Sequence, residues 1–282
     1  MKIITSVNEM QEQAGKWRVE GKSVGFVPTM GFLHEGHLTL VQQSTQACDI
    51  TVMSIFVNPL QFGPNEDFEL YPRNIEQDQK HAEAAGVDVL FCPTAKELYP
   101  QELPVKMVAV KRTDRLCGVS RPGHFDGVVT VLSILFHVVQ PTVAYFGRKD
   151  AQQVAVVQGL VEAYRYPVKI VAIDTVRESD GLAKSSRNVY LSNQEREEAP
   201  FLFKALTHAK KLAKNHSTEE ILKETESIIL NNTSGKIDYI EMLSYPYLEK
   251  IQFAKGTVII ALAVQFSQAR LIDNVVFTLE EG

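Results

Sequence analysis

The chain has 282 residues, of which 45% are hydrophobic and 22% are charged, and its formal net charge is -5. This composition is typical of a globular protein with one large domain or two of modest size, and it excludes a disordered chain. The acidic balance argues against broad binding to nucleic acid or to anionic membranes, so any phosphate site has to be local.

The N-terminal residues lack the apolar run and the small-residue cleavage site of a secretory signal. No later segment is apolar over a length that could span a bilayer. The three cysteines, Cys48, Cys92 and Cys117, fit neither a disulfide framework nor a zinc ribbon, and we expect inert packing thiols. These features predict a cytoplasmic protein.

Residues 1–184 alternate between strand-like and helix-like segments. Strands are predicted at 25–29, 49–57, 87–91, 143–146 and 168–171, helices at 38–48, 74–85 and 127–139, and loop or short turns at 58–73. Such alternation is typical of an α/β fold with a parallel sheet, in which ligands bind beyond the carboxyl ends of the strands. We therefore expect a Rossmann-like domain here, with its chemistry in the loops that follow strands.

The pattern changes beyond Ser185, where helix-like segments come before a run of strands. Helices are predicted at 194–214 and 218–230, and strands at 237–242, 257–264 and 271–277. Residues 185–282 are accordingly expected to form a smaller α+β domain.

A first polar cluster occupies residues 28–37, directly after the first buried strand. His34 and His37 are three apart and can lie on one side of a helical turn, while Gly31 and Gly36 let a ligand approach the backbone. A helix that starts here would point free N–H groups at an anion. Taken alone, such a pair is more often incidental or metal-binding than phosphate-binding.

A second cluster at residues 180–188 combines two cations with two hydroxyls, in Lys184, Ser185, Ser186 and Arg187. These groups supply the charge-assisted and hydroxyl hydrogen bonds that a triphosphate needs. A solvated polar loop is the alternative. Together with the histidine cluster, the segment resembles the two signatures of class I synthetases and their nucleotidyltransferase relatives.

A third cluster at residues 144–153 follows another predicted strand, so it belongs on the same ligand face. Gly147 permits close backbone approach, Lys149 can meet phosphate, and Asp150 could accept hydrogen bonds from ribose hydroxyls. Its alternative is a plain strand-to-helix turn with Asp150 as the N-cap.

Two further polar loops span residues 58–67 and 117–127. The neutral amide of Gln61 suits substrate hydroxyls, and Arg121 suits a carboxylate or a phosphate. For His124 a structural role in holding its loop is favoured over a role in binding.

Five motifs in this order and spacing resemble the pantoate–β-alanine ligases, over essentially the whole chain. They are Pro-Thr-Met-Gly-x-Leu-His-x-Gly-His from Pro28, Phe-Val-Asn-Pro-x-Gln-Phe-Gly from Phe56, Arg-Pro-Gly-His-Phe-x-Gly-Val from Arg121, Tyr-Phe-Gly-x-Lys-Asp-x-Gln-Gln from Tyr145, and Arg-x-x-x-Gly-Leu-Ala-x-Ser-Ser-Arg-Asn from Arg177. The resemblance implies a Rossmann-like domain over residues 1–184 that binds ATP and pantoate, and a lid domain over residues 185–282. It also implies ATP, pantoate and β-alanine as substrates, a pantoyl-adenylate intermediate, Mg²⁺ and a homodimer.

The resemblance also assigns site residues. It places ATP against Met30, Gly31, Phe32, Leu33, His34, Glu35, Gly36, His37, Gly147, Arg148, Lys149, Asp150, Val176, Lys184, Ser185, Ser186 and Arg187. It places pantoate or β-alanine against Asn58, Gln61, Arg121 and Gln153, gives catalytic roles to His37, His34 and Lys149, and gives a metal-water contact to Asp78. Lys184 departs from many relatives, which carry Met or Leu there.

Two other functions share parts of this pattern. A nucleotidyltransferase would share the histidine motif and the parallel sheet, but a phosphorylated substrate would want cations where Gln61 and Gln153 stand. A nucleotide-sensing module without turnover would explain the phosphate loops but not the amide-rich substrate set.

Overall fold

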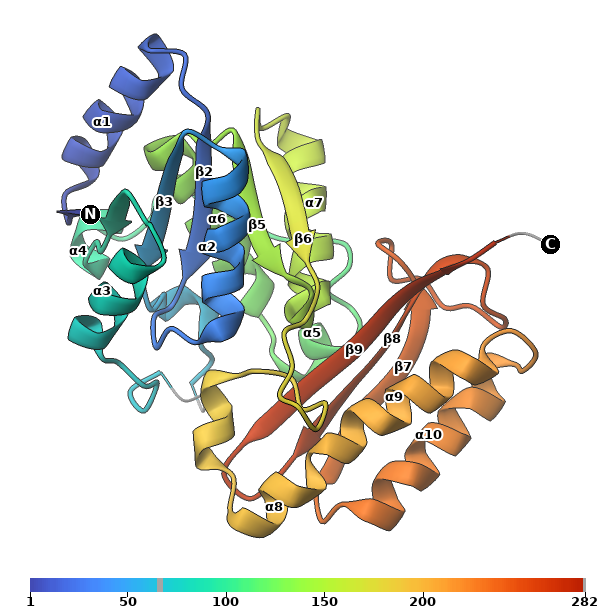
Figure 1. The fold of residues 1–282 in the computed structure, drawn as a ribbon. Helices are drawn as coiled ribbons and strands as arrows, with labels where there is room; N and C mark the ends of the chain where they lie inside the picture. Colours follow the sequence, from blue (N-terminus) through green and yellow to red (C-terminus); the bar gives the residue numbers. More distant parts are fainter. Residues whose placement is uncertain (65–67, 281–282) are drawn as a thin grey trace. The chain divides into compact units, whose positions relative to one another are not determined.

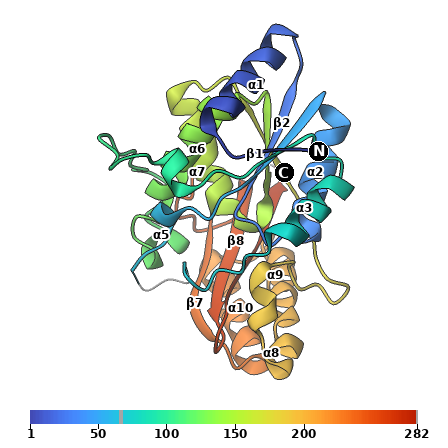
Figure 2. The same ribbon diagram turned by 90° about the vertical axis from the view of Figure 1, so that its left-hand side faces the viewer.

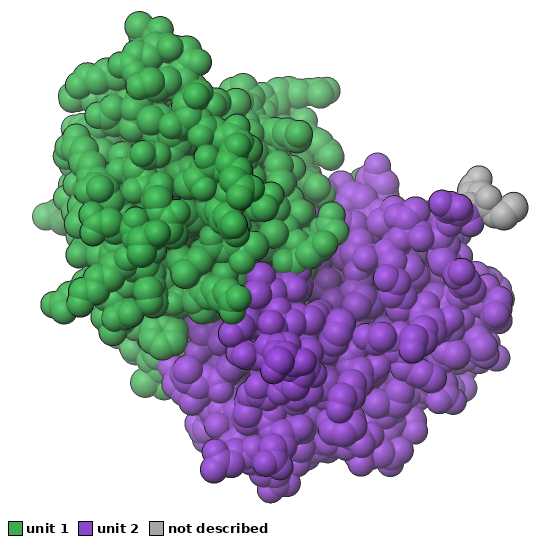
Figure 3. Space-filling model, viewed as in Figure 1, with its two compact units in different colours: residues 1–111, 121–148, 156–174 green, residues 112–120, 149–155, 175–282 purple. Residues whose placement is uncertain are grey.

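The computed structural model describes residues 1–64 and 68–280. The chain forms two compact units, of residues 1–111, 121–148 and 156–174 and of residues 112–120, 149–155 and 175 onwards (Figure 3). Three segments of the expected first domain, 112–120, 149–155 and 175–184, thus lie in the second unit. They do so because their residues hydrogen-bond to its strands, as Leu116 N does to the Glu241 side chain at 3.0 Å.

The first unit is built on a parallel sheet of six strands in the order β1-β4-β3-β2-β5-β6 (Figure 1). The bounds are Lys2–Ile4 (β1), Val24–Thr29 (β2), Ile50–Ile55 (β3), Val89–Phe91 (β4), Val143–Gly147 (β5) and Lys169–Ile173 (β6). The five strands predicted from sequence are confirmed, because a parallel sheet covered on both faces needs the continuous apolar runs that identified them. β1 was missed because three residues are too few to show a period.

Helices cover both faces of this sheet (Figures 1 and 2). On one face α2 (Glu35–Ala47) and α3 (Ile75–Ala84) bury Leu40, Val41 and Ala82 against strand residues Val27, Met53 and Leu90. On the other face lies α6 (His124–Val139), which is buried along most of its length, with α1 (Val7–Val19) beside it. The shorter helices are η1 (Pro59–Gln61) and α4 (Ala95–Leu98), and α7 (Ala151–Tyr164) continues from the second unit.

The strand order reverses between β2 and β5. The chain runs from β2 outward through β3 to β4, and later from β5 to β6 on the other side of β2. Ligands of open α/β sheets bind at such a switch point, beyond the carboxyl ends of the strands. The first and third polar clusters follow β2 and β5, so both begin at this point.

The second unit has an antiparallel sheet of β7 (Lys236–Ser244), β8 (Gly256–Gln265) and β9 (Arg270–Leu279). Its two longest helices, α9 (Pro200–Leu212) and α10 (Thr218–Asn232), pack on one face. The other face packs against Ala151 of α7 and against Leu116, which directly precedes α5 (Cys117–Ser120). The remaining elements are η2 (Arg148–Asp150), η3 (Ser186–Tyr190) and α8 (Asn193–Glu198).

These elements confirm the expected fold class, a Rossmann-like parallel sheet with a smaller α+β unit. One helix prediction was wrong: residues 194–214 form α8 and α9 instead of a single helix. Pro200 is the first residue of α9, and it interrupts the run because it has no N–H to donate to the preceding turn.

All three cysteines are free thiols, as expected. Burial raises the pKa of Cys92 to about 11, and the Asp78 carboxylate adds to this, so Cys92 is an unreactive thiol near neutral pH. In the described part of the chain, no helix has both the length and the apolar character to cross a membrane.

Candidate active site

A tight turn after β2 carries the first polar cluster. Gly31 and Phe32 both have positive φ angles, 85° and 51°. Asp78 of α3 is 2% exposed, and its carboxylate accepts hydrogen bonds from Phe32 N at 2.8 Å and from Leu33 N at 2.7 Å. A Cβ atom on Gly31 would lie 3.0 Å from Asp78 Oδ2, so the turn requires glycine there. Asp78 therefore fixes the shape of the backbone that leads into α2.

His34 and His37 begin helix α2. His34 is the N-cap residue and its Nδ1 accepts from Gly36 N at 3.1 Å, while His37 Nδ1 accepts from His34 N at 3.3 Å. The two ring centroids are 4.1 Å apart. Because each Nδ1 is an acceptor, the proton of each neutral ring is on Nε2. The helix start thus places two imidazole N–H donors at the positive end of the helix dipole, which is a favourable arrangement for an anion.

Asp78 was expected to contact a metal-bound water, and this stays a prediction: each of its oxygens accepts one backbone N–H and keeps a second acceptor site. Within residues 1–64 and 68–280, no three His, Cys, Asp or Glu side chains lie close enough together to hold a metal ion. The geometry favours a role for Asp78 in shaping the turn.

The loop after β3 is held by Asn58, which is 1% exposed. Its Nδ2 donates to Gln61 Oε1 at 3.0 Å and to Gly127 O at 3.1 Å, and its Oδ1 accepts from Tyr99 at 2.9 Å. A Cβ on Gly127 would lie 2.2 Å from Leu60 O, so α6 approaches this loop closely. Asn58 is thus committed to structure. Residues 65–67, at the end of this polar loop, lie outside the described residues.

Arg121 and His124 stand over the same loop. His124 Nδ1 donates to Gln61 O at 2.9 Å, and Arg121 lies 3.2 Å from His124 Nε2 and 3.5 Å from Gln61 O. The structural role expected for His124 is confirmed. These two side chains bind the backbone carbonyl of Gln61, and Asn58 binds its side-chain oxygen. Both the backbone and the side chain of Gln61 are therefore held in place within the first unit.

The third cluster divides between the units. Gly147 and Arg148 are the last residues of segment 121–148 of the first unit. Arg148 pairs with Asp174 at 2.7 Å. A Cβ on Gly147 would meet no atom within 4 Å. Lys149 and Asp150 belong to the second unit, with 3.8 Å between Lys149 Nζ and Asp150 Oδ2.

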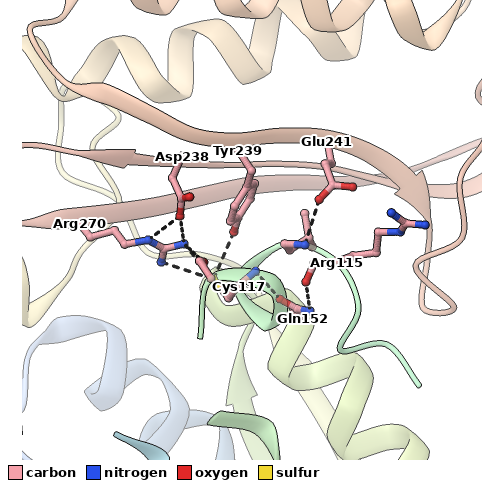
Figure 4. A network of polar contacts seen from close by, with 9 residues as sticks. Arg115, Cys117, Gln152, Asp238, Tyr239, Glu241 and Arg270 are labelled. Atoms are coloured by element: carbon pink, nitrogen blue, oxygen red, sulfur yellow. Dashed lines mark hydrogen bonds and ion pairs between the residues drawn. The ribbon is translucent and has the colours of Figure 1, made fainter. Parts of the chain in front are cut away.

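Gln152 and Gln153 follow on α7 and differ in role. Gln152 is buried, donates to the carbonyls of Arg112 and Arg115 at 2.9 and 2.8 Å, and accepts from Cys117 N at 2.9 Å (Figure 4). The side-chain amide of Gln152 thus makes the hydrogen bonds that a neighbouring backbone would otherwise make with residues 112–117. Gln153 is half-buried, and its amide is the one that the resemblance gives to substrate.

The second cluster is an ordered turn. Ser185 caps η3 by accepting from Arg187 N at 3.2 Å, and Ser186 is buried. Lys184 N donates to Val176 O at 2.9 Å, and Lys184 Nζ lies 3.1 Å from a Glu178 oxygen. The segment is therefore more constrained than a solvated loop.

Sequence reasoning missed two residues of β9, Asp273 and Asn274, which are both buried. Asp273 pairs with both terminal nitrogens of Arg177, and Asn274 donates to Lys149 O at 2.9 Å. Burial raises the pKa of the Asp273 carboxyl, against the opposing effect of Arg177. An Asp-Asn pair inside the apolar run 271–277 was the available signal, because buried polar groups need partners.

The expected site residues accordingly fall into two sets. The first unit contains Met30, Gly31, Phe32, Leu33, His34, Glu35, Gly36, His37, Asn58, Gln61, Asp78, Arg121, Gly147 and Arg148. The second unit contains Lys149, Asp150, Gln153, Val176, Lys184, Ser185, Ser186 and Arg187. The parallel sheet and the helix start at its switch point place the chain among Rossmann-like proteins, whose ligands bind beyond the carboxyl ends of the strands.

Comparison with known proteins defines the family. A model described as pantoate-beta-alanine ligase matches residues 2–276. Pantothenate synthetase from Bacillus pumilus (strain SAFR-032) is 56% identical over 284 residues, which cover 100% of this chain and 98% of that protein. The crystal structure of pantothenate synthetase from Thermus thermophilus has a TM-score of 0.92 at 42% identity, covering 98% of this chain and 99% of that chain.

A third relative is a pantoate-beta-alanine ligase from Francisella tularensis, whose crystal structure is a complex with beta-gamma ATP and beta-alanine. It has a TM-score of 0.81 at 32% identity and covers 98% of this chain and 97% of that chain. The chain belongs to the pantoate–β-alanine ligase family, and the joining of pantoate to β-alanine is its enzymatic activity.

Proposed function

We propose that this enzyme joins pantoate to β-alanine in two steps with ATP as the energy source. A pantoate carboxylate oxygen attacks the α-phosphorus, and the bond to the bridging oxygen breaks to release pyrophosphate and leave pantoyl adenylate. The amine of β-alanine then attacks the acyl carbon, loses a proton and expels AMP, giving pantothenate. The observation that best supports this proposal is the start of α2, where two imidazole donors stand at a helix N-terminus beyond β2.

In the first unit, the stretch from Met30 to His37 is proposed to bind ATP, with Gly147 and Arg148. His37, helped by His34, donates from Nε2 to the phosphate oxygens on which negative charge develops. As neutral donors held by their Nδ1 atoms, the two rings act through position and charge distribution. Gln61, with Asn58 and Arg121 behind it, is proposed to bind pantoate and to lie near β-alanine.

In the second unit, Lys149 is the proposed catalytic cation, because a primary ammonium can move with the phosphate as charge shifts. Asp150 and Val176 contact the nucleotide, and Gln153 binds pantoate. The turn of Lys184, Ser185, Ser186 and Arg187 is proposed to meet the phosphates, with hydroxyl donors from the two serines and a charge-assisted donor from Arg187.

Mg²⁺ is proposed to enter with the phosphates of ATP, where it would neutralise their charge. Such ions are usually held by one or two carboxylates together with substrate phosphates. Asp78 is proposed to contact a water bound to the metal, since each of its oxygens accepts one backbone N–H and keeps a second acceptor site, and no step is assigned through the metal. A cytoplasmic homodimer, and a lid domain of residues 185–282, are further proposals that depend on the family resemblance.

The test is isotopic exchange between pyrophosphate and ATP, with and without pantoate. We expect exchange only with pantoate, and mass spectrometry of enzyme with ATP and pantoate but no β-alanine should detect pantoyl adenylate. Exchange that proceeds without pantoate would rule out this route.

A further inference from the structure

Asp273 and Asn274 are consecutive on β9, and each contacts a different part of the second unit to which phosphate binding is proposed. We propose that this pair is a positioning device, which holds Lys149 and the turn of residues 184–187 in register with each other. The inference rests on the proposed function, because it concerns the residues that would meet the phosphates of ATP.

Successive side chains of a strand point to opposite faces of its sheet. The odd-numbered residues Leu271 and Phe277 lie on the same face of β9 as Asp273, and they belong to the core beneath α9. The even-numbered Val276 lies on the same face as Asn274, and it packs with Ala151. Asp273 therefore faces the α9 side, and Asn274 faces residues 149–155. One dipeptide thus reaches segments on both faces of the sheet.

On the first of these faces, Asp273 holds Arg177. Its Oδ2 and Oδ1 accept from the two terminal nitrogens of Arg177 at 2.7 and 2.9 Å, in a fork that fixes the guanidinium plane. That plane lies 3.5 Å from the centre of the Phe203 ring, and Arg177 also donates to Gly181 O at 3.1 Å. Arg177 pairs in a β-bridge with Ala183, directly before the phosphate-binding turn. Asp273 thus holds the base of the turn that carries Lys184.

On the opposite face, Asn274 holds the backbone of Lys149. Asn274 is 7% exposed and donates from Nδ2 to Lys149 O at 2.9 Å. The backbone N–H of Asn274 donates to Asp273 Oδ1 at 2.7 Å, so the network runs from the Asp273 carboxylate through the main chain of Asn274 to its side chain. Burial raises the pKa of the Asp273 carboxyl, and the positive charge of Lys149 partly opposes that rise. The main chain of the proposed catalytic cation is therefore tied to the carboxylate that holds the other phosphate cluster.

Neither residue of the pair needs to touch ATP for this to matter. Displacement of a catalytic group by about 1 Å can cost roughly 100-fold in rate, because the groups must already be in place when charge develops. A network with two buried polar side chains allows little freedom, since a lost partner leaves a buried group unsatisfied.

The test compares Asn274→Asp and Arg177→Lys with the unchanged enzyme. Asn274→Asp keeps the shape of the side chain but replaces its donor with a carboxylate, and Arg177→Lys keeps the charge but removes the fork, so a loss shared by both variants does not come from the added charge. Asp238→Asn is the matched control, because it weakens another Arg–Asp contact of the same sheet, that of Arg270 at 2.7 Å (Figure 4). Thermal unfolding of each variant is measured first, and rates are compared below the lowest transition.

We expect both test variants to lower pantoate-dependent pyrophosphate exchange by about 10- to 100-fold. The second step, measured with prepared pantoyl adenylate and β-alanine, should fall much less, because it releases AMP and involves no pyrophosphate. A loss of stability alone would lower both steps together. If Asn274→Asp does not fold, Arg177→Lys decides the question by the same comparison.

The inference is overturned if exchange by the two variants matches that of Asp238→Asn, or if both half-reactions fall equally. If the unchanged enzyme shows no pantoate-dependent exchange, the proposed function itself fails and the inference fails with it. Normal exchange by the unchanged enzyme and by both test variants refutes the positioning role alone.

Discussion

The two stretches with proposed phosphate contacts each depend on a buried carboxylate, but the carboxylates act over different distances along the chain. Asp78 binds the backbone N–H groups of Phe32 and Leu33 and so shapes a turn that already leads into a helix. Asp273 binds the side chain of Arg177, 96 positions away, and through Asn274 it is tied to Lys149. In the first stretch a carboxylate from 45 and 46 positions along the chain binds the backbone directly, whereas a network of side chains that spans 96 positions holds the second.

This difference predicts how each stretch responds to substitution. Removal of a donor at the helix start should alter the chemistry directly, because Asp78 fixes the backbone that leads into this helix independently of that donor. Substitutions around Asp273 should alter geometry first and rate as a consequence.

The largest effect is expected for His37→Ala. It removes the proposed Nε2–H donor, and we expect pyrophosphate release in single turnover to slow by about 100- to 1,000-fold. The substitution also removes the acceptor of the His34 N–H group. His37→Asn, which can still accept at the helix start, serves as the control and should recover stability without recovering rate. An unchanged rate in His37→Ala would exclude the catalytic role.

A somewhat smaller effect is expected for Asp78→Ala, which leaves two N–H groups of the turn without their acceptor. Unfolding in urea should show a loss of about 2 to 3 kcal/mol, with a raised KM for ATP. Asp126→Ala is the control, because among the described hydrogen bonds it removes the acceptor of one backbone group, Ala109 N, at 3.0 Å. Unchanged stability together with a lost response to Mg²⁺ would show instead that Asp78 acts through the metal.

Sequence alone predicted the first stretch better than the second, for a physical reason. The strand, the glycine turn and the helix start at His34 are adjacent in the chain, so composition and period reveal them. The network of Asp273 and Asn274 joins positions far apart, and no local pattern shows which partner a buried carboxylate has. For the same reason no structural role was predicted for Gln152. Only the structure shows that its side-chain amide hydrogen-bonds to the backbone of residues 112–117.

Glu195 separates stability from positioning within the second unit. Backbone hydrogen bonds from Ser192 N and Ser267 N lower the pKa of this carboxyl from 4.5 to about 2. Because the pKa of this carboxyl is lower in the folded protein, its ionised form stabilises the fold at pH values above 4.5. This contribution is lost as the pH falls from 4.5 towards 2.

Glu195→Gln should therefore lower the free energy of unfolding by roughly 2 kcal/mol at neutral pH and remove that part of the pH dependence. Urea unfolding over a pH series measures both. The rate of pyrophosphate exchange should hold at temperatures below the transition, because Glu195 contacts neither Lys149 nor Arg177 in any described hydrogen bond. A fall in exchange as large as that of Arg177→Lys would show that general loosening of the unit is enough to disturb the phosphate contacts.

The smallest effect is expected for Lys184→Met. The ammonium of Lys184 lies 3.1 Å from Glu178, and the two side chains are 24% and 34% exposed, so the pair is screened by solvent. Such pairs contribute at most about 1 kcal/mol, and the backbone N–H of Lys184, which binds Val176 O, is kept in the variant. We expect unfolding in urea to change within that limit and the KM for ATP to rise by no more than about fivefold. Glu178→Gln is the matched control, since it removes the same pair without removing a cation. If Lys184→Met raises the KM for ATP by roughly 100-fold while Glu178→Gln does not, the ammonium itself contacts phosphate, and the second stretch depends on direct charge as much as on its long-range network.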